Sequence, residues 1–255
     1  MKLAIIQTNI DWGNPSANVD KANEIIDRLG QADLFVLPEM FSTGFCTVPK
    51  GVAEPVGCDT LQWMKHKAAE KDCAIAGSIA TEEGGCFYNR FYFVHPDGRV
   101  EWYDKKHLFT YGGEDKHFTA GKQRVIVTHR GVRILLQVCY DLRFPVWARN
   151  RKEYDMILYV ASWPTSRVEA WKTLLKARAI ENQCYVAGVN RVGEDPNCSY
   201  CGGSAIIDPY GRVLEECEDG VEMTATGEID MEKLEAFRLK FPVLNDADDF
   251  ELTDL

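Results

Sequence analysis

The sequence of 255 residues contains no long hydrophobic run. Its longest apolar stretches, such as residues 157–161, are far shorter than the roughly 20 residues that a membrane-spanning helix requires. The apolar start at residues 1–6 is followed at once by polar side chains, which favours a strand rather than a signal peptide. We therefore expect a cytoplasmic protein that does not bind a membrane.

Positive charge is also scarce, because 29 Lys and Arg stand against 39 Asp and Glu and leave a net charge of −10. A chain of this charge repels phosphate backbones, so we expect no nucleic-acid partner. The remaining composition, with 45% hydrophobic and 27% charged residues, is typical of a folded globular protein.

The spacing of histidine and cysteine does not indicate a metal site. The five histidines do not cluster, and the nine cysteines include a lone Cys-x-x-Cys motif at Cys198 and Cys201. A zinc site needs further ligands at fitting spacing, and a redox motif needs a thioredoxin-like context. We interpret the motif as a surface loop with two thiols and expect free cysteines rather than disulfides. No metal or other cofactor is predicted.

Short apolar runs alternate with longer amphipathic ones, without a linker or an internal repeat. The length suits one large α/β domain or two small ones, and we expect a single domain over residues 1–255. Amphipathic periodicity predicts helices after Ser16 and after Asp59. The pattern therefore predicts a mixed sheet layered with helices, of α/β or α+β class. The expected strands are residues 3–7, 34–37, 74–79, 90–95, 100–103, 132–138, 156–161, 184–190, 204–208 and 224–230.

Turn and capping residues predict some of the element boundaries. A Pro-Asp-Gly turn at residues 96–98 predicts a hairpin between the strands on either side of it. Ser166 and Glu169 have the spacing of a capping box, which predicts a helix that begins there and ends near Asn182.

Three of the expected strands are each followed by a reactive side chain. Glu39 ends Leu-Phe-Val-Leu-Pro-Glu, Lys105 ends Trp-Tyr-Asp-Lys, and Cys139 ends Ile-Leu-Leu-Gln-Val-Cys. In open α/β sheets, ligand sites lie outside the carboxyl ends of the strands. If the three strands are parallel neighbours, the carboxylate, the ammonium group and the thiol meet at one edge of the sheet.

This combination of groups can cleave an amide. A thiol with an ordinary pKa near about 8.5 is mostly protonated at pH 7, so Cys139 needs a base, and Glu39 can accept its proton. Lys105 balances the negative charge and then stabilises the oxyanion of a tetrahedral intermediate. The backbone N–H of Tyr140 is a natural second donor to that oxyanion. The product of this step is an acyl-thioester that water hydrolyses.

Each of these residues also has a plainer interpretation. Glu39 can be a solvated loop carboxylate, Lys105 can belong to a solvated pair with Lys106, and Cys139 can be an inert core thiol. The residues alone therefore leave two further function classes open. One is a binding protein without catalytic activity, and the other is a protease that uses a histidine as its base.

Four segments resemble the carbon–nitrogen hydrolase (nitrilase) superfamily. Leu-Pro-Glu-Met-Phe at residues 37–41 is similar to its glutamate segment, and Tyr-Asp-Lys-Lys-His-Leu-Phe at 103–109 is similar to its lysine segment. Val-Cys-Tyr-Asp-Leu-Arg-Phe-Pro at 138–145 is similar to its nucleophile segment. A fourth match covers residues 113–121, and the order of the segments is that of the superfamily.

The resemblance implies a role for each matched residue. It implies that Glu39, Lys105 and Cys139 are the catalytic residues, and it selects Lys105 because the catalytic lysine stands two residues before His-Leu. It also implies that Glu114 helps to position the substrate and the lysine.

The resemblance further implies a fold and an activity. The superfamily fold is a four-layer α-β-β-α sandwich whose members usually pair through helices, so we expect a homodimer or a higher homo-oligomer. Residues 138–145 and 241–250 are most similar to the ω-amidase branch. The implied substrates are water and a small dicarboxylate monoamide, such as 2-oxoglutaramate or 2-oxosuccinamate. Another amidase of the superfamily, or a carbamoyl-amine hydrolase, is the alternative.

Residues near the strand ends are candidates for substrate binding. Arg143, four residues after the thiol, can anchor a substrate carboxylate. The favoured interpretation is instead a buried arginine that pairs with Glu181 or Asp141 and holds the nucleophile turn. Three aromatic side chains are expected to line the pocket, with core packing as the alternative for each: Phe41, Tyr140 and Trp163.

Overall fold

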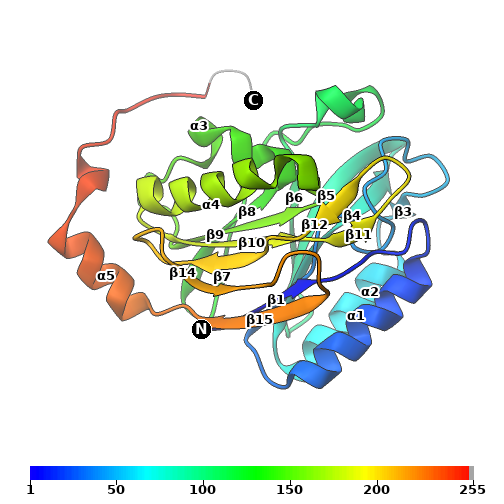
Figure 1. Ribbon diagram of the computed structural model, residues 1–255, viewed down its shortest axis with the longest axis horizontal. Helices are drawn as coiled ribbons and strands as arrows, with labels where there is room; N and C mark the ends of the chain where they lie inside the picture. Colours follow the sequence, from blue (N-terminus) through cyan, green and yellow to red (C-terminus); the bar gives the residue numbers. More distant parts are fainter. Residues whose placement is uncertain (253–255) are drawn as a thin grey trace.

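The computed structural model describes residues 1–252 and contains two β-sheets that pack face to face (Figure 1). The first sheet has the order β15-β1-β2-β4-β5-β6, and β3 pairs with β4. β1, β2 and β4 run parallel, whereas β15 and β5 run antiparallel to their neighbours. Its strands are β1 (Lys2–Gln7), β2 (Leu34–Val36), β3 (Glu54–Pro55), β4 (Ala74–Glu83), β5 (Cys86–Val94), β6 (Val100–Asp104) and β15 (Met223–Glu228).

The second sheet has the order β14-β13-β10-β9-β8-β7, with β8, β9 and β10 parallel at its centre. Its strands are β7 (Ile126–His129), β8 (Val132–Val138), β9 (Met156–Ala161), β10 (Tyr185–Asn190), β13 (Ala205–Ile207) and β14 (Val213–Glu216). Apart from both sheets, β11 (Val192–Glu194) and β12 (Ser199–Cys201) form a separate antiparallel hairpin.

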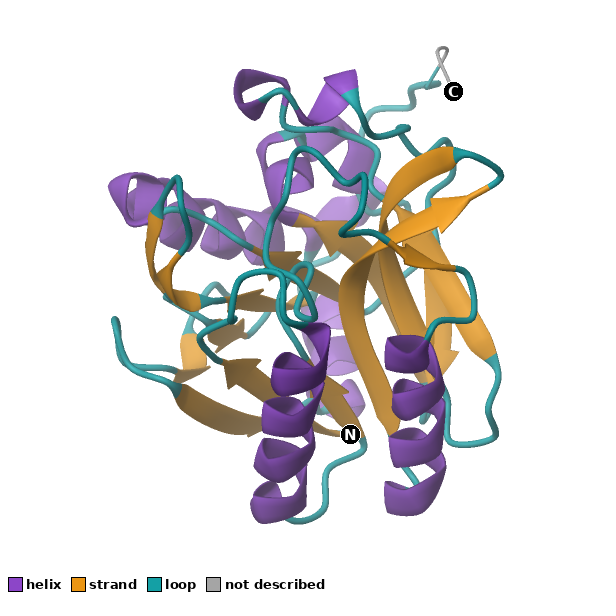
Figure 2. Cartoon of the chain, turned by 90° about the vertical axis from the view of Figure 1, so that its right-hand side faces the viewer, coloured by secondary structure: helices purple, strands orange, loops and turns teal. Residues whose placement is uncertain are grey.

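Helices cover the outer face of each sheet (Figures 1 and 2). α1 (Pro15–Leu29) and α2 (Asp59–Lys71) pack on the first sheet, through side chains such as Ile26 and Met64. α3 (Pro145–Ala148) and α4 (Val168–Asn182) pack on the second sheet, chiefly through Trp171 and Leu175. The expected four-layer α-β-β-α sandwich is therefore confirmed.

The core between the sheets is apolar. Phe91 and Phe93 of β5 share one buried cluster with Ile134 and Leu136 of β8. The central strands are covered on both faces, by the other sheet and by helices. For this reason their sequences read as continuous apolar runs, of which β9 is an example.

Two local predictions have different outcomes. The hairpin of β5 and β6 forms as predicted, with antiparallel pairing on either side of the Pro-Asp-Gly turn. The capping box of Ser166 and Glu169 is wrong, because a 3-10 turn at Thr165–Arg167 precedes α4 and makes Arg167 the N-cap, whose side chain makes no capping hydrogen bond. Other 3-10 turns are Thr110–Gly112, Glu114–Lys116, Cys139–Arg143 and Val243–Asn245.

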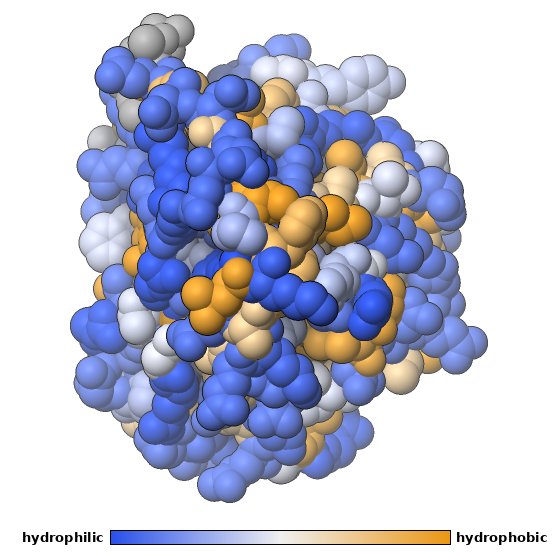
Figure 3. All heavy atoms as spheres, turned by 90° about the vertical axis from the view of Figure 1, so that its left-hand side faces the viewer, coloured by the Kyte–Doolittle hydropathy of each residue, from blue (hydrophilic) through white to orange (hydrophobic). Residues whose placement is uncertain are grey.

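After β15 the described chain leaves the sandwich. α5 (Met231–Lys240) follows β15, and the chain then runs along the outside of the molecule (Figure 1). Figure 3 shows apolar side chains exposed among hydrophilic ones on this side of the molecule. Within residues 1–252, no helix is both long enough and apolar enough to cross a membrane.

Candidate active site

The three reactive side chains come from two different sheets. Glu39 follows β2 and Lys105 follows β6 in the first sheet, whereas Cys139 follows β8 in the second. β4 and β5 lie between β2 and β6, so the three strands are not the parallel neighbours that this meeting point was conditional on. The structure still brings the groups together, because the strand ends of the two sheets meet where the sheets face each other.

Lys105 lies between two carboxylates. Its Nζ is 3.0 Å from Glu39 Oε1 and 2.9 and 3.1 Å from the two oxygens of Glu114, and all three side chains are fully buried. Burial lowers the pKa of Lys105, but the charges of Glu114 and Glu39 outweigh it and raise the pKa above its usual value. Burial raises the pKa of Glu114, against the attraction of Lys105. The lysine is therefore held as an ammonium ion in a dry site.

Asn89 and Ser162 fix the orientation of Glu39. The Asn89 amide donates to Glu39 Oε1 at 2.7 Å and to Glu114 Oε1 at 3.1 Å, and the backbone N–H of Ser162 donates to Glu39 Oε2 at 2.7 Å. Sequence analysis missed Asn89, because the expected strand began at residue 90. A polar residue on a strand gives no sequence signal that it points to a buried carboxylate.

Cys139 has a backbone conformation that is rare for a side-chain-bearing residue. Its φ is 46°, in the left-handed region, at the junction of β8 and the 3-10 turn Cys139–Arg143. Met40, the residue after Glu39, has a similar φ of 44°. Such strain persists only where the surrounding structure imposes it, and it is concentrated at functional sites. The left-handed conformation of Cys139 turns the chain sharply immediately after β8 and leaves this residue partly exposed.

The surroundings of Cys139 favour the protonated form of its thiol. Burial raises its pKa well above the usual value, and the negative charge of Glu39 raises it further, whereas Lys105 acts in the opposite direction. A thiolate would share this pocket with two carboxylates and one ammonium ion. The proton must therefore leave the sulfur as a new bond forms, and Glu39 is placed to accept it.

Asp141 connects the nucleophile segment to the lysine segment. One of its oxygens accepts from the Tyr103 hydroxyl at 2.8 Å and from Val138 N–H at 3.0 Å. The other accepts from His107 at its backbone N–H, 2.9 Å, and at Nδ1, 2.8 Å. Asp141 is fully buried, so these bonds hold the two turns in one geometry. Sequence analysis named Asp141 only as a partner for Arg143.

Cys139 opens into a pocket of about 50 Å³ between aromatic walls. The predicted wall residues Tyr140 and Trp163 line it. Among the described residues no histidine lines it. The other lining residues are Phe45, Phe109, Arg143, Ser162, Pro164, Arg167, Cys198 and Tyr200.

The prediction that Phe41 lines the pocket is wrong. Phe41 is buried in the layer between the first sheet and α2, with its ring 6.1 Å from that of Trp63. It fits against Gly77, where a Cβ would lie only 2.9 Å from the phenylalanine ring. The left-handed residue Met40 reverses the chain after Glu39, so the next side chain points away from the site. Phe45 lines the pocket instead.

Arg143 is exposed and lies on the pocket wall, with its guanidinium 4.9 Å from the centre of the Trp163 ring. The favoured interpretation, a buried ion pair, is wrong. Arg178 pairs with Glu181 at 2.9 Å instead, and Asp141 binds His107. Arg178 lies on α4, within helical reach of Glu181 on the same face, whereas Arg143 is exposed on the pocket wall.

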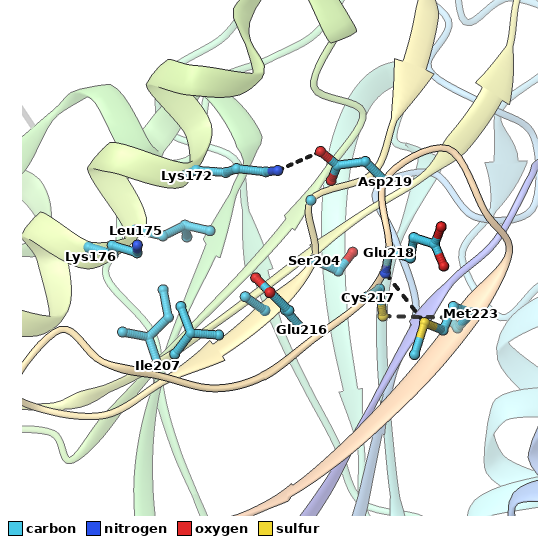
Figure 4. A pocket seen from close by; sticks show the side chains of 13 residues that line it. Lys172, Leu175, Lys176, Ser204, Ile207, Glu216, Cys217, Glu218, Asp219 and Met223 are labelled. Carbon is cyan, nitrogen blue, oxygen red and sulfur yellow. Dashed lines mark hydrogen bonds and ion pairs between the residues drawn. The ribbon is translucent and has the colours of Figure 1, made fainter.

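A larger hollow of about 480 Å³ lies elsewhere, beside α4 and β14 (Figure 4). Lys172 and Asp219 form an ion pair of 2.5 Å across its rim. Burial raises the pKa of Cys217 to about 12, and its thiol donates to a backbone carbonyl at 3.7 Å. This hollow therefore lacks an activated nucleophile, despite its size.

The Cys-x-x-Cys motif lies on the β11–β12 hairpin. Cys198 and Cys201 are both free thiols, and Cys198 lines the pocket that contains Cys139, a position that no sequence pattern predicts. No group of three His, Cys, Asp or Glu side chains within residues 1–252 is placed to hold a metal ion.

Comparisons with known proteins identify the family of the chain. Residues 2–239 match the family model of the carbon–nitrogen hydrolases. The chain is 45% identical to the ω-amidase YafV of Yersinia enterocolitica, over 99% of this chain and 98% of that protein. It is 36% identical to the 2-oxoglutaramate amidase of Bacillus subtilis, over 96% of each. XC1258 of Xanthomonas campestris, a superfamily protein with an arsenic adduct in its active site, has a TM-score of 0.97 to it at 40% identity, over 99% of both chains. The chain belongs to the carbon–nitrogen hydrolase family.

Proposed function

We propose that this carbon–nitrogen hydrolase removes the terminal amide of small dicarboxylate monoamides, such as 2-oxoglutaramate and 2-oxosuccinamate. Water is the second substrate, and the products are the acid and ammonia. The observation that carries the proposal is the buried Lys105 ammonium, which bridges Glu39 and Glu114 and acts electrostatically on the thiol of Cys139. These are the acid–base group, the cation and the nucleophile that amide cleavage requires.

In the first half-reaction, the sulfur of Cys139 attacks the amide carbonyl carbon while its proton passes to Glu39. The carbonyl oxygen becomes an oxyanion, which receives hydrogen bonds from Lys105 and from the backbone N–H of Tyr140. That N–H lies in the first turn of a helix, where such groups have no partner within the helix. Glu39 then gives the proton to the amide nitrogen, the C–N bond breaks, ammonia leaves, and an acyl-thioester remains.

In the second half-reaction, water attacks the thioester carbonyl while Glu39 accepts one of its protons. The same two donors stabilise the second oxyanion. The C–S bond then breaks, and the sulfur of Cys139 recovers a proton from Glu39. Glu114 keeps Lys105 in position through both steps, because both oxygens of its carboxylate accept hydrogen bonds from Nζ, alongside the one that Glu39 accepts.

Two guanidinium groups support a substrate with a second carboxylate. Arg143 lies over the ring of Trp163, and Arg167 lies over the ring of Phe109 at 5.4 Å. Neither arginine forms an ion pair with a carboxylate of residues 1–252, so both are free to bind an anion. The small volume of the pocket favours a short acyl chain. The names of the ω-amidase and 2-oxoglutaramate amidase relatives support the same substrate class.

Replacement of the nucleophile tests the mechanism. Cys139→Ala and Cys139→Ser should each lower ammonia release from 2-oxoglutaramate by about a thousandfold or more. Mass spectrometry of the wild-type protein, quenched during turnover, should find the acyl group on Cys139. Cys86→Ser, which removes an exposed thiol, is the matched control and should keep full activity. Activity in Cys139→Ser close to that of the wild type would rule out the proposed mechanism.

A substrate panel tests the substrate class. Arg143→Gln should raise KM for 2-oxoglutaramate by roughly tenfold, because a charged hydrogen bond contributes about 1.5–3 kcal/mol. The same variant should hydrolyse a neutral amide, butyramide, as well as the wild type does. A clear preference of the wild-type protein for N-carbamoyl-β-alanine would instead favour the carbamoyl-amine hydrolase.

A further inference from the structure

Arg191 is a fully buried arginine. It follows β10 and leads into the β11–β12 hairpin. Within residues 1–252 no ion pair involves its guanidinium, whereas Arg90 and Arg178, which are also buried, each pair with an acidic side chain. Burial of an unpaired charge is costly, so the neighbours of Arg191 must compensate for it in another way.

Backbone carbonyls supply part of this compensation. Nη2 of Arg191 donates to Asn9 Oδ1 at 3.1 Å, to the carbonyl of Ile10 at 3.0 Å and to that of Glu194 at 3.1 Å. Nε donates to the carbonyl of Val192 at 3.2 Å. One guanidinium therefore ties the segment after β1 to both ends of β11.

The ring of Tyr200 supplies a further part of this compensation. The guanidinium carbon of Arg191 lies 4.6 Å from the centre of this ring, and the ring lines the pocket that contains Cys139. The Tyr200 hydroxyl donates to Asp195 Oδ2 at 2.5 Å, and Asp195 Oδ1 accepts from the backbone N–H of Cys198 at 2.8 Å. Tyr200 and Cys198, the hairpin residues that line the pocket, are thus both connected to the buried guanidinium of Arg191.

Gly193 shows how closely the hairpin fits on the segment beneath it. Its φ is 85°, and a Cβ at this position would lie only 2.0 Å from Asn9 Oδ1. Val192 also pairs with Asn9 in an isolated bridge. The hairpin is therefore fixed at its base by close packing, and Arg191 and Tyr200 determine where its pocket-facing side lies.

We propose that Arg191 is a positioning residue for the substrate pocket: its guanidinium holds the ring of Tyr200, and with it the β11–β12 wall, next to Cys139. The inference rests on the proposed function, since it assigns how one wall of that site is held. Glu39, Lys105 and Cys139 are positioned by other elements. Loss of the contact should therefore weaken substrate binding and leave the chemistry at the sulfur unchanged.

A double-mutant cycle between Arg191→Lys and Tyr200→Leu tests this inference. Each single variant should raise KM for 2-oxoglutaramate at least about fivefold, while kcat changes less than about twofold. If the arginine acts through the ring, the double variant should raise KM no further than the more severe single variant. Effects on KM that multiply in the double variant would overturn the inference.

Tyr200→Phe provides a test that does not depend on how well the Arg191 variant folds. This variant keeps the ring over the guanidinium and loses the hydrogen bond to Asp195, so its KM should rise clearly less than that of Tyr200→Leu. A KM equal to that of Tyr200→Leu would overturn the inference. Arg238→Lys is the matched control, because Arg238 also donates to backbone carbonyls but lies outside the pocket. It should lower Tm without a change in KM.

The alkylation of Cys139 by iodoacetamide separates this inference from the proposed function. Arg191→Lys and Tyr200→Leu should react at the wild-type rate, since the environment of the sulfur is intact. A rate that falls in proportion to kcat/KM would mean that the variants disturb the triad, and would overturn the positioning role. The proposed function fails independently, if Cys139→Ser keeps the hydrolytic activity.

Discussion

Glu39 has two opposite effects on the thiol beside it. As a base it is placed to remove the proton from Cys139, and as a charge it raises the pKa of that thiol, second only to burial. The carboxylate therefore stabilises the protonated thiol at rest and accepts its proton during attack. Proton transfer depends on the basicity of Glu39, whereas the rise in the thiol pKa depends on its charge. A single substitution of Glu39 therefore separates the two effects.

Glu39→Gln should abolish hydrolysis and yet lower the pKa of the Cys139 thiol. The amide accepts no proton, so ammonia release should fall by about a thousandfold or more. The thiolate loses one repulsive neighbour and keeps the Lys105 ammonium, so alkylation by iodoacetamide should begin at a lower pH than in the wild type. The pH profile of alkylation measures this shift. A profile displaced to higher pH would contradict the role assigned to the Glu39 charge.

Asp141→Asn should affect both activity and stability. The amide cannot accept all four hydrogen bonds that the carboxylate accepts, so the free energy of unfolding should fall by roughly 2 kcal/mol. The turns that carry Lys105 and Cys139 then lose their common anchor, and kcat should fall by about a hundredfold. Urea denaturation and steady-state kinetics measure the two effects. Asp155→Asn, which disturbs a buried acid paired with Arg133, should lower stability alone.

The residues of the site differ in how far the sequence predicts them. Glu39, Lys105 and Cys139 each follow an apolar run within a recognisable motif, and the structure places all three together. Phe41 was misplaced because its direction depends on the left-handed turn at Met40, which no pattern of residue types reveals. Asn89 was missed because its role depends on carboxylates that are distant in sequence.

At the level of elements, periodicity predicted most strands and helices but could not predict their order in the sheets. β2 and β6 are separated by β4 and β5, and β8 belongs to the other sheet. Strand order is set by packing between distant segments, whereas apolar patterns report only that a segment is buried. The predicted α4 ends at Asn182, but its start depends on a local 3-10 turn.

His129, at the end of β7, links the two sheets at a point remote from the pocket. It is buried, and its Nε2 donates to the backbone carbonyl of Asp33, which precedes β2. Burial lowers the pKa of His129, and the nearby His95 and Arg130 lower it further, while the contact with Asp33 acts in the opposite direction. The folded protein therefore favours the neutral imidazole.

The lowered pKa of His129 predicts that the folded protein loses stability in mild acid. The unfolded chain takes up a proton at His129 near the ordinary pKa of about 6.5, before the folded chain does. The contribution of His129 is thus fully present above that pH and is lost as the pH falls toward the lower folded pKa. His129→Gln should reduce this part of the pH dependence, as measured by urea denaturation between pH 5 and pH 8. An unchanged pH dependence would contradict the linkage.

On the scale of the whole molecule, apolar side chains remain uncovered beside the outer helices. Ile180 on α4 is 54% exposed, and Tyr210 is 51% exposed and packs against Phe237 of α5 with tilted rings whose centres are 4.0 Å apart. Ile180 also contacts the turn that contains Gly211. This face includes an outer helix of the second sheet, where the predicted homodimer would pair.

Ile180→Glu should therefore shift the protein from a dimer to a monomer, because it places a charge in the predicted interface. Sedimentation equilibrium of both proteins measures the change in mass. Val56→Glu, which introduces the same charge at a residue 50% exposed on another face, is the control and should leave the mass unchanged. A wild-type protein that sediments as a monomer at all concentrations would contradict the prediction of a homodimer.

The catalytic groups that come from different sheets also come from different parts of the sequence. Glu39, Lys105 and Glu114 precede the irregular segment 122–124, and Cys139 follows it. β15 from the later part pairs with β1 from the earlier part, which gives two fragments a surface on which to reassociate. A gene cut at this segment would encode two halves that are inactive alone. If the two halves were fused to two proteins that bind each other, ammonia production would report that binding.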